Sequence, residues 1–543
     1  MSSVYQEFIR TTQRAEDKPF LQVPYLAAKS YSDTAVNQSY GQTLQFVTDL
    51  IRQYQSKGYG APMRIGLVLE NRPDFFVHWL ALNALGCSVL PISAASQLDE
   101  IAYFLEHGEP VLVVTIPERV DLLERACQLT AKPVPVIGLN RFGNLPEAPS
   151  SKAQLSGPED NGELECALLY TSGSTGKPKG CILSNEYFTQ FGHWYRCLGG
   201  LAQIAWGEER LLTPLPLGHM NAMAVSTTGM IMNGGCIIQL DRFHSSTWWQ
   251  TVRESKATIL HYLGVLPAIL LKLPVDKGDD FSGQIRFGFG AGVNPDHHQR
   301  FEQRFGFPLI ESWAMTECGS GGCITANREP RHVGSACFGF ATDTVQYQVV
   351  DEQKLPVIKG DNGELRVRAN GAYPKQGFFS GYLKDPEATN EAWAGGWLNT
   401  GDIVRQGEDG QLHFVDRLKN VIRRSGENIS ALAVETHLLN DPVISEVIVT
   451  AVPDETRGDE VAACVVLGEK MKADEDMAVS IVLRSLSKLT YYKVPGYIIF
   501  CDELPKTASN KPRRAEITAL AVSRLNHECC WDTRYLKKRQ INK

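Results

Sequence analysis

Between two apolar runs the chain carries the stretch Tyr170-Thr171-Ser172-Gly173-Ser174-Thr175-Gly176-Lys177-Pro178-Lys179-Gly180. The apolar run before it, Cys166–Leu169, predicts a strand, so the stretch predicts the loop that leaves this strand. Its three glycines let backbone N–H groups turn toward an anion, its four hydroxyls add donors, and its two lysines add positive charge. The alternative is a flexible Ser/Gly linker, but the fixed place between apolar runs and the two lysines favour a phosphate-binding loop.

This loop differs from a Walker A sequence at two positions. Thr171 stands where that pattern has its first glycine, and Pro178 stands where it has Ser or Thr after the lysine. The sequence therefore disfavours a P-loop kinase or GTPase.

The segments around the loop predict an α/β fold. Upstream, we expect strands at Arg64–Leu69, Ser88–Ile92 and Val111–Thr115, with a helix that begins at Pro73. Strands that alternate with helices predict a parallel sheet covered by helices. Further along, short strand-like runs separated by glycine turns predict a smaller β-rich part. These runs are Val345–Val350, Glu364–Arg368 and Gln411–Val415.

Past Arg417 the pattern returns to mixed α/β. We expect helices at Ala431–Leu439 and Ala478–Leu489, and strands at Val443–Val452 and Glu460–Leu467. A charged and polar stretch between apolar runs, near residues 416–420, is typical of a domain boundary. We therefore predict a large N-terminal domain, residues 1–416, of stacked α/β sheets with a small β-rich subdomain, followed by a small α+β C-terminal domain, residues 417–543.

Composition and charge exclude several classes of protein. Of the 543 residues, 43% are apolar and 21% are charged, which excludes a disordered or fibrous chain. The 54 basic and 61 acidic residues give a net charge of −7, which argues against a protein that coats nucleic acid. The thirteen cysteines contain no CxxC pair and fit free thiols in a reducing cytosol. Because we find no secretory signal and no membrane-spanning run, we expect a cytoplasmic protein without integral membrane association.

The loop sequence YTSGSTGKPKG resembles the signature of the adenylate-forming superfamily, which includes acyl-CoA synthetases, luciferases and the adenylation domains of peptide synthetases. Further motifs follow in that family's order. Gly290-Ala291-Gly292 resembles its adenine-side loop. The segment 311–317 (ESWAMTE) resembles its aromatic-Gly-x-Thr-Glu motif, with Trp313 in place of Tyr or Phe and Ala314 in place of Gly.

The resemblance implies roles for the residues of these motifs. Trp313 would lie against adenine, Thr316 would touch the α-phosphate, and Glu317 would hold Mg²⁺, a cation that prefers oxygen ligands. A core aromatic is the alternative for Trp313. The segment 397–402 (WLNTGD) resembles the Trp-x-x-Thr-Gly-Asp motif, so Asp402 would accept hydrogen bonds from the ribose diol.

The same resemblance extends into the C-terminal part. In the segment 416–420 (DRLKN), Arg417 would add a second ribose contact, although such an Asp-Arg pair is also typical of a surface ion pair, and Phe414 would line the nucleotide pocket. Lys419 would be the hinge of a mobile C-terminal domain that rotates between two half-reactions. The segment 424–430 (RSGENIS) is similar to the coenzyme A loop of carnitine/crotonobetaine–CoA ligases, with Gly426 against the pantetheine.

The segment 505–511 (PKTASNK) resembles the Pro-x-Thr-x-x-Gly-Lys motif that carries the family's catalytic lysine. Lys511 is then this lysine, and Lys506 is the alternative. Asn510 stands where Gly is usual, and Asn tolerates the left-handed conformation of that turn.

The implied activity is that of an AMP-dependent acyl-CoA synthetase, most like carnitine/crotonobetaine–CoA ligases. A carboxylate attacks the α-phosphorus of ATP, pyrophosphate leaves, and the acyl-adenylate then passes its acyl group to coenzyme A. ATP, Mg²⁺ and coenzyme A are the implied cofactors, and a small carboxylic acid is the partner, with no nucleic acid; a homodimer is left open. The alternatives are an enzyme that loads a carrier protein, a luciferase-like oxygenase, and a nucleotide-binding regulator, which would need neither Lys511 nor Glu317.

The segment 217–223 (LGHMNAM) resembles the family segment that walls the acyl pocket. His219 either gates this pocket or contacts the carboxylate; the alternative is that it forms part of the wall without transferring a proton. Met and Trp side chains among the candidates favour apolar contact, and no acidic residue in these segments awaits a cationic tail. The sequence does not name the acid. The pocket candidates are His219, Met220, Met223, Trp313, Ala314 and Gly319.

The full set of expected site residues has three parts. Catalysis is assigned to Lys511, Thr316, Glu317 and His219. Magnesium binding is assigned to Glu317 and Thr171. Nucleotide and coenzyme A binding is assigned to Thr171, Ser172, Gly173, Ser174, Thr175, Lys179, Gly290, Ala291, Gly292, Glu311, Ser312, Trp313, Ala314, Asp402, Phe414, Arg417, Lys419 and Gly426.

Overall fold

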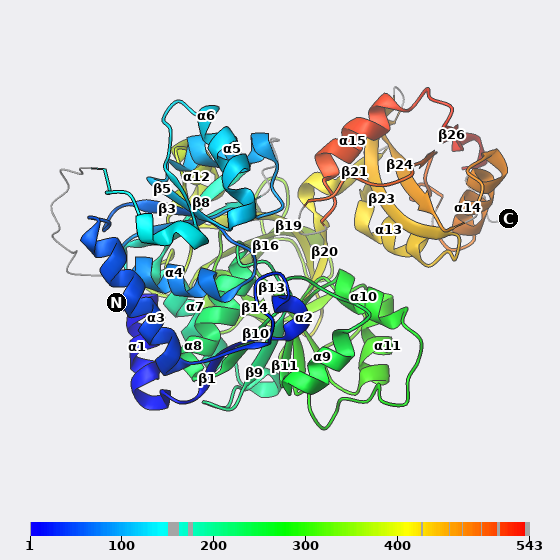
Figure 1. Cartoon of the computed structure of the whole chain (residues 1–543). Coiled ribbons are helices and arrows are strands. Elements are labelled where there is room, and N and C mark those ends of the chain that lie inside the picture. The colour runs from blue at the N-terminus through cyan, green and yellow to red at the C-terminus, as the bar shows by residue number, and fades with distance from the viewer. Residues whose placement is uncertain are drawn as a thin grey trace. The chain divides into compact units, whose positions relative to one another are not determined.

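The computed structural model describes residues 2–149, 162–171, 178–424, 427–454, 457–469, 471–489, 491–507 and 511–537 (Figure 1). The chain forms two compact units. Unit 1 comprises the described residues of 2–171, 178–347 and 366–399, and unit 2 those of 348–365 and 400–537. The domain boundary expected after residue 416 stays a prediction.

Unit 1 contains a seven-stranded sheet with the order β18-β8-β7-β4-β3-β5-β6. Strands β4, β3, β5 and β6 run parallel, β7 is parallel to β4, and β8 is antiparallel to β7. The strands are β3 (Arg64–Val68), β4 (Ser88–Pro91), β5 (Leu112–Thr115), β6 (Val136–Gly138), β7 (Glu165–Thr171), β8 (Lys179–Ser184) and β18 (Gly381–Tyr382). The three strands predicted upstream of the loop are thereby confirmed, and so is the predicted helix, α4 (Pro73–Ala84).

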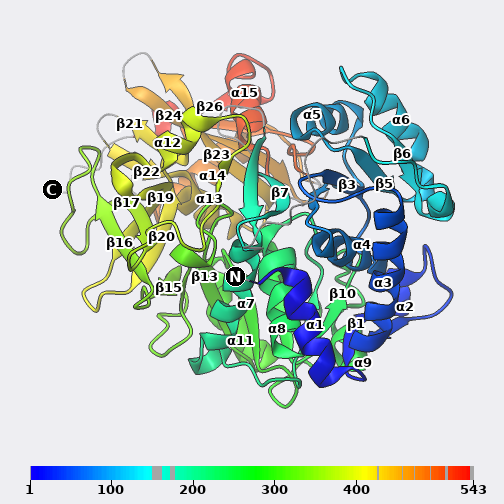
Figure 2. The same cartoon turned by 90° about the vertical axis from the view of Figure 1, so that its left-hand side faces the viewer.

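Helices cover this sheet because its central strands are apolar on both faces. Helices α5 (Leu98–Gly108) and α6 (Val120–Gln128) lie against β5 and β6 (Figure 2) and share one apolar core with them. Helix α4 (Pro73–Ala84) begins with proline at its first position, where the missing N–H costs nothing and the fixed φ favours the helix.

A second sheet of unit 1 has eight strands in the order β14-β13-β12-β11-β9-β10-β1-β2. Its six central strands are parallel, and the strands at both edges, β2 and β14, are antiparallel to their neighbours. The strands are β1 (Pro19–Val23), β2 (Val36–Ser39), β9 (Arg210–Thr213), β10 (Cys236–Gln239), β11 (Ile259–Leu263), β12 (Phe287–Ala291), β13 (Leu309–Trp313) and β14 (Ile324–Thr325).

The other α-helices of unit 1 surround these two sheets (Figure 1). They are α1 (Val4–Ala15), α2 (Tyr25–Ala28), α3 (Tyr40–Ser56), α7 (Asn185–Cys197), α8 (Gly229–Asn233), α9 (Trp248–Ser255), α10 (Val265–Leu271), α11 (Pro295–Phe305) and α12 (Pro386–Ala392). Among the described residues, no helix combines the length and apolar character needed to cross a membrane.

A buried ion-pair cluster fixes α11. Glu302 accepts hydrogen bonds from His298 (3.1 Å) and from Arg331 (2.6 Å). Burial opposes ionisation of Glu302, but the two donors and the positive charge of Arg331 outweigh it and hold the pKa of this carboxyl at about 2. Glu302 and Arg331 are therefore both charged at neutral pH.

The β-rich part predicted between the two α/β regions consists of β15 (Cys337–Gly339), β16 (Val345–Val350), β17 (Asn362–Ala369), β19 (Leu398–Gln406) and β20 (Leu412–Arg417). Strands β16, β17 and β19 begin in one unit and end in the other. The antiparallel pair β19 and β20 places Asp402 opposite Arg417.

The rest of unit 2 is an α+β structure, as predicted. Its mixed sheet has the order β22-β21-β24-β25-β26, with β23 also paired to β24. Apolar side chains of these strands and of two helices form one core. The elements are β21 (Val421–Arg424), β22 (Glu427–Ser430), α13 (Ala431–Leu439), β23 (Ile444–Asp454), β24 (Gly458–Leu467), α14 (Glu475–Leu486), β25 (Tyr497–Phe500), α15 (Arg514–Ser523) and β26 (Cys530–Asp532). All thirteen cysteines are free thiols, as expected.

Candidate functional site

The predicted phosphate loop connects two antiparallel strands. Thr171 ends β7, Lys179 begins β8, and the two residues are cross-strand partners. A Walker A loop instead joins a strand to a helix, so the strand-to-strand context agrees with the two sequence departures from that pattern. Ser172, Gly173, Ser174 and Thr175, which carry most of the predicted phosphate contacts, lie outside the described residues.

A buried carboxylate lies beside this hairpin. Glu317 accepts a hydrogen bond from the phenol of Tyr382 (Oε1 to Oη, 2.9 Å), and Tyr187 donates a hydrogen bond to the backbone oxygen of Thr316 (2.9 Å). The Lys179 ammonium lies 4.9 Å from the ring centre of Tyr382. The structure thus brings together Glu317, Thr316 and Lys179, three of the predicted residues, around a tyrosine that the sequence analysis missed.

Two further residues, Asp385 and Cys181, lie close to Lys179 and Glu317. The Lys179 ammonium is 3.8 Å from the Asp385 carboxylate, a second residue that the sequence analysis missed. Burial and the negative charge of Glu317 raise the pKa of the Cys181 thiol, whose strand carries it next to Glu317. No pattern in residues 381–385 signalled a link to Glu317, because strand pairing across about 200 residues of sequence creates it.

Glu311 acts as a clamp on the predicted adenine-side loop, because its side chain binds the backbone of that loop. Its carboxylate accepts hydrogen bonds from the backbone N–H of Gly292 (2.8 Å) and Val293 (3.3 Å) and from the phenol of Tyr262 (2.6 Å). Burial raises the pKa of Glu311, and the donors around it oppose that rise. The carboxylate therefore holds the predicted adenine-side loop in shape, and a direct nucleotide contact of Glu311 stays a prediction.

At two positions of that loop, the backbone geometry explains why the residue is glycine. A Cβ atom on Gly290 would lie 2.3 Å from the backbone oxygen of Tyr262, so strands β11 and β12 approach too closely for a side chain there. Gly292 has a φ of +77°, which glycine adopts without strain. Ala291, between them, ends β12 and is half-buried.

The end of β13 and the residue that follows it contain the predicted adenine contacts. Trp313 is buried, and its ring centre is 6.1 Å from that of Phe338, which fits the core-aromatic alternative; a contact with adenine stays a prediction. Ser312 shares a hydrogen bond with Thr325 (2.8 Å) inside the sheet. Ala314 is half-buried.

His219 stands just before a π-helical segment, η4 (Asn221–Thr228), where its backbone oxygen accepts a hydrogen bond from Met223 N–H (3.1 Å). Its side chain is half-buried, as is that of Met220, whereas Met223 is buried. π-helices are rare and are frequently found at functional sites. The role of His219 at the acyl pocket stays a prediction.

A buried histidine fixes the start of this π-helix. The His261 ring lies 2.9 Å from the side-chain oxygen of Asn221 through Nδ1, and 2.9 Å from the hydroxyl of Tyr195 through Nε2. Burial lowers the pKa of His261 to about 3, so the ring is neutral. Because the Asn221 oxygen can only accept, Nδ1 carries the proton and Nε2 accepts from Tyr195.

Unit 2 carries the predicted ribose residues. The Arg417 guanidinium lies 2.8 Å from the carboxylate of Asp402, which is buried, and Phe414 is half-buried on the same strand as Arg417. Arg417 is thus in an ion pair, but its partner is a second predicted site residue. Lys419 lies in the short helix η7 (Leu418–Asn420), and Gly426 lies outside the described residues.

The two candidate lysines differ in their contacts. The Lys506 ammonium forms an ion pair with Glu446 (2.6 Å). The pKa of Lys511 is lowered by the protein atoms around its ammonium and by the positive charge of Arg417, although the residue as a whole is exposed. Its backbone oxygen accepts a hydrogen bond from Thr507 N–H (2.8 Å). These contacts favour Lys511 over Lys506 as the reacting lysine.

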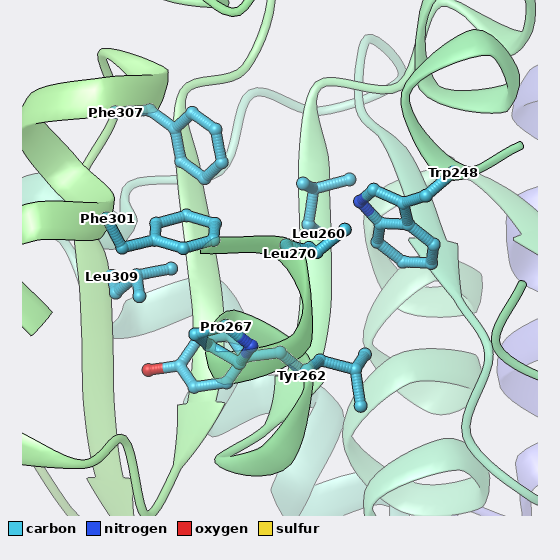
Figure 3. A pocket seen from close by; sticks show the side chains of 9 residues that line it. Trp248, Leu260, Tyr262, Pro267, Leu270, Phe301, Phe307 and Leu309 are labelled. Atoms are coloured by element: carbon cyan, nitrogen blue, oxygen red, sulfur yellow. The ribbon is translucent and has the colours of Figure 1, made fainter. Parts of the chain in front are cut away.

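An apolar hollow lies between α10, α11 and the strands β11 and β13 (Figure 3). Of its lining, only the Tyr262 hydroxyl and the Trp248 indole are polar groups, and that hydroxyl is bound to Glu311. Such a lining cannot neutralise a carboxylate, so this hollow is not where the reacting carboxylate would bind. The lining residues are Trp248, Leu260, Tyr262, Leu266, Pro267, Leu270, Phe301, Phe307 and Leu309.

Two family models match the chain: the AMP-binding enzyme model over residues 8–383 and the AMP-binding enzyme C-terminal domain model over residues 433–511. The chain belongs to the AMP-binding enzymes. The resemblance to the adenylate-forming superfamily, drawn from short motifs along the chain, is thereby confirmed. This AMP-binding enzyme is an ATP-dependent acyl-CoA synthetase, because its curated relatives are CoA ligases of that family.

One relative is the sulfoacetate–CoA ligase of Cupriavidus necator, 30% identical over 513 residues, which cover 92% of this chain and 94% of the relative. Another is the crotonobetaine/carnitine–CoA ligase of Salmonella enteritidis, 26% identical over 486 residues, 87% of this chain and 91% of the relative. Since the relatives are CoA ligases, the AMP-binding enzyme is not favoured as a loader of carrier proteins.

Solved structures share the fold. ATP-bound MatB from Rhodopseudomonas palustris is 22% identical, with a TM-score of 0.78 over 96% of this chain and 99% of that one. The o-succinylbenzoate CoA synthetase MenE from Bacillus subtilis, in complex with its acyl-adenylate, is 20% identical, with a TM-score of 0.79 over 95% of this chain and 98% of that one. The predicted α/β fold of the AMP-binding enzyme, with a smaller C-terminal part, is confirmed.

Proposed function

We propose that the chain activates a small carboxylic acid with ATP and Mg²⁺, giving an acyl-adenylate and pyrophosphate, and then transfers the acyl group to coenzyme A. The observation that carries this proposal is the buried Glu317 carboxylate beside Lys179 at the base of the phosphate loop. A carboxylate is a poor acyl donor because oxide would have to leave. Adenylation replaces that leaving group with AMP, which leaves readily.

The residues of unit 1 fit a Mg²⁺ ion held mainly by ATP. In the described parts of the chain, no three His, Cys, Asp or Glu side chains gather as a dedicated metal cage. Mg²⁺ is commonly held by one or two carboxylates together with substrate phosphates, and Glu317 supplies one carboxylate at the predicted phosphate loop. Mg²⁺ would neutralise phosphate charge there, with Thr171 as a further oxygen donor.

The roles of the other unit 1 residues follow from charge. Lys179 offers its ammonium to the departing phosphates, and Thr316 offers a hydroxyl to the α-phosphate. Because two anions must meet, the chain acts mainly by positioning them and by neutralising charge. Glu311 keeps the adenine-side loop in shape through Gly292 and Val293.

Unit 2 supplies the ribose contacts and the lysine. Asp402 accepts from the ribose diol, and Arg417, which orients Asp402, adds a donor. Lys511 donates its charge to the acyl carboxylate and the α-phosphate as negative charge accumulates. Lys419 is the hinge of a domain that moves before thioester formation, and Gly426 receives coenzyme A.

Product analysis tests the proposal. Purified protein is incubated with ATP, Mg²⁺ and a panel of acids, with and without coenzyme A, and mass spectrometry follows AMP and acyl products. Sulfoacetate, crotonobetaine and carnitine enter the panel because the relatives are named for them. Thioester that forms only with coenzyme A supports the proposal and names the acid. An adenylate that is never passed to coenzyme A refutes the second half-reaction.

Lys511→Ala separates the two half-reactions. It should abolish adenylate formation and leave thioester formation from supplied acyl-AMP intact, because the lysine acts only in the first step. Lys506→Ala is the matched control, since that lysine is held by Glu446 and should leave both steps unchanged. Loss of adenylation in Lys506→Ala with retention in Lys511→Ala would overturn the assignment.

We further propose a cytoplasmic location, which cell fractionation tests, and a homodimer, which analytical ultracentrifugation tests.

A further inference from the structure

Two segments far apart in the sequence pair next to Glu317. Strand β18 lies antiparallel to β8, with Tyr382 opposite Cys181 and Gly381 opposite Ile182. Backbone hydrogen bonds from Ser380 N–H to Ile182 (2.9 Å) and from Leu383 N–H to Gly180 (2.8 Å) extend the pairing. Strand β8, which begins at Lys179, and strand β18, which carries Tyr382, are therefore paired in one sheet.

The Tyr382 phenol is a hydrogen-bond donor to the carboxylate. Burial and the negative charge of Glu317 raise the pKa of Tyr382 far above its usual value, so the phenol keeps its proton. The bond from Oη to Glu317 Oε1 is 2.9 Å long, and the Phe379 N–H holds the backbone oxygen of Glu317 (3.1 Å). Both the main chain and the side chain of Glu317 are thus fixed by residues 379–382.

The ring of Tyr382 has a second contact. The Lys179 ammonium lies 4.9 Å from the ring centre, within the range of a cation–π interaction. One tyrosine therefore contacts both charged groups of the proposed site: its hydroxyl binds Glu317, the proposed metal ligand, and its ring contacts Lys179, the proposed phosphate contact.

We propose that Tyr382 is a positioning residue for the metal–nucleotide complex: its hydroxyl orients the Glu317 carboxylate toward Mg²⁺, and its ring places the Lys179 ammonium. The inference rests on the proposed role of Glu317. An unrestrained carboxylate would have to lose rotational freedom on binding the metal, and the phenol removes that cost beforehand.

Tyr382→Phe tests the hydroxyl because it keeps the ring and its contact with Lys179. The dissociation constant of Mn²⁺ for the complex of protein and a non-hydrolysable ATP analogue, measured by electron paramagnetic resonance, should rise about tenfold, the lower end of what a hydrogen bond to a charged group contributes. The Mg²⁺ concentration that gives half-maximal adenylation should rise by a similar factor, and excess Mg²⁺ should restore the rate. Thioester formation from supplied acyl-AMP should not change.

Tyr40→Phe is the matched control. The Tyr40 phenol is also buried and donates to backbone oxygens of Met230 (3.0 Å) and Gly235 (2.8 Å), within unit 1 but outside the Glu317 group. This variant should lower stability without changing Mn²⁺ affinity. If Tyr382→Phe changes stability alone, as Tyr40→Phe does, the positioning role is refuted.

Glu317→Gln distinguishes failure of the inference from failure of the proposed function. If Glu317→Gln weakens Mn²⁺ binding and Tyr382→Phe does not, Glu317 holds the metal but needs no positioning, and the inference falls. If Glu317→Gln itself leaves Mn²⁺ affinity unchanged, the metal role of Glu317 falls with it. If Tyr382→Phe weakens Mn²⁺ binding in the wild-type background but not in Glu317→Gln, the tyrosine acts through Glu317 as proposed.

Discussion

Replacement of Glu311 by alanine should destabilise unit 1 before any nucleotide is added. The carboxylate satisfies three donors, the N–H groups of Gly292 and Val293 and the phenol of Tyr262. A buried donor left without a partner costs about 1–3 kcal/mol. The 3.3 Å contact to Val293 is weak, and water can enter the vacated space, so we expect a loss of about 3 kcal/mol in the free energy of unfolding rather than the full sum.

Urea unfolding followed by tryptophan fluorescence measures this loss. All tryptophans except Trp531, eight of the nine, belong to unit 1, so the signal reports on that unit. Tyr262→Phe removes one of the three donors and keeps the carboxylate, so it should cost about 1.5 kcal/mol. Both losses should appear with and without ATP.

A direct nucleotide role for Glu311 gives a different result. If Glu311→Ala unfolds with wild-type free energy while the KM for ATP rises, the carboxylate acts on the ligand and the clamp interpretation is wrong. If stability falls and the KM for ATP rises together, the loop that Glu311 shapes is the nucleotide contact.

Three further predictions concern other parts of the chain. Gly290→Ala should destabilise the protein by about 1–3 kcal/mol in thermal or urea unfolding, because the new methyl group would lie 2.3 Å from a backbone oxygen of β11. Gly283→Ala is the control: no atom lies within 4 Å of its new methyl group, so its stability should not change. Asp402→Asn should raise the KM for ATP about tenfold in initial-rate assays, since it weakens the ribose contact and the pairing with Arg417, and an unchanged KM would contradict the ribose assignment. In the folded protein the pKa of Glu302 is about 2, below its ordinary value of 4.5. Ionised Glu302 therefore contributes about 3 kcal/mol to the free energy of unfolding above pH 4.5, and this contribution is lost as the pH falls toward 2. Glu302→Gln should make stability fall less steeply with acid in unfolding curves, and an unchanged slope would refute this role of Glu302.

Local patterns were sufficient for elements whose residues carry their own reason. The apolar run at 64–68 and the proline at the start of α4 fix a strand and a helix without reference to distant residues. The site motifs were found for the same reason, since each is a short contiguous segment. The motifs could not show which atoms each side chain binds. The place of Glu311 in a motif suggested a ligand contact, whereas in the structure its carboxylate accepts hydrogen bonds from backbone N–H groups.

The missed residues share one property, a contact made by strand pairing. Tyr382 lies 65 positions after Glu317 in the sequence, and only the alignment of β18 with β8 brings it there. Similarly, the π-helix η4 contacts His261, whose ring lies 2.8 Å from the hydroxyl of Ser226, 35 positions away in the sequence. Such contacts have no local signal in a single sequence.

The pairing of β18 with β8 also limits how this enzyme can be rebuilt. If the hairpin of residues 165–184 were replaced by that of another synthetase, the foreign β8 would have to pair with this chain's edge strand β18, residues 381–382. The donor's residues 379–383 would have to travel with the hairpin, since they complete its backbone pairing and carry the tyrosine. Exchange boundaries drawn along the linear sequence would separate the two, so modular swaps in this region should be planned by sheet and not by segment.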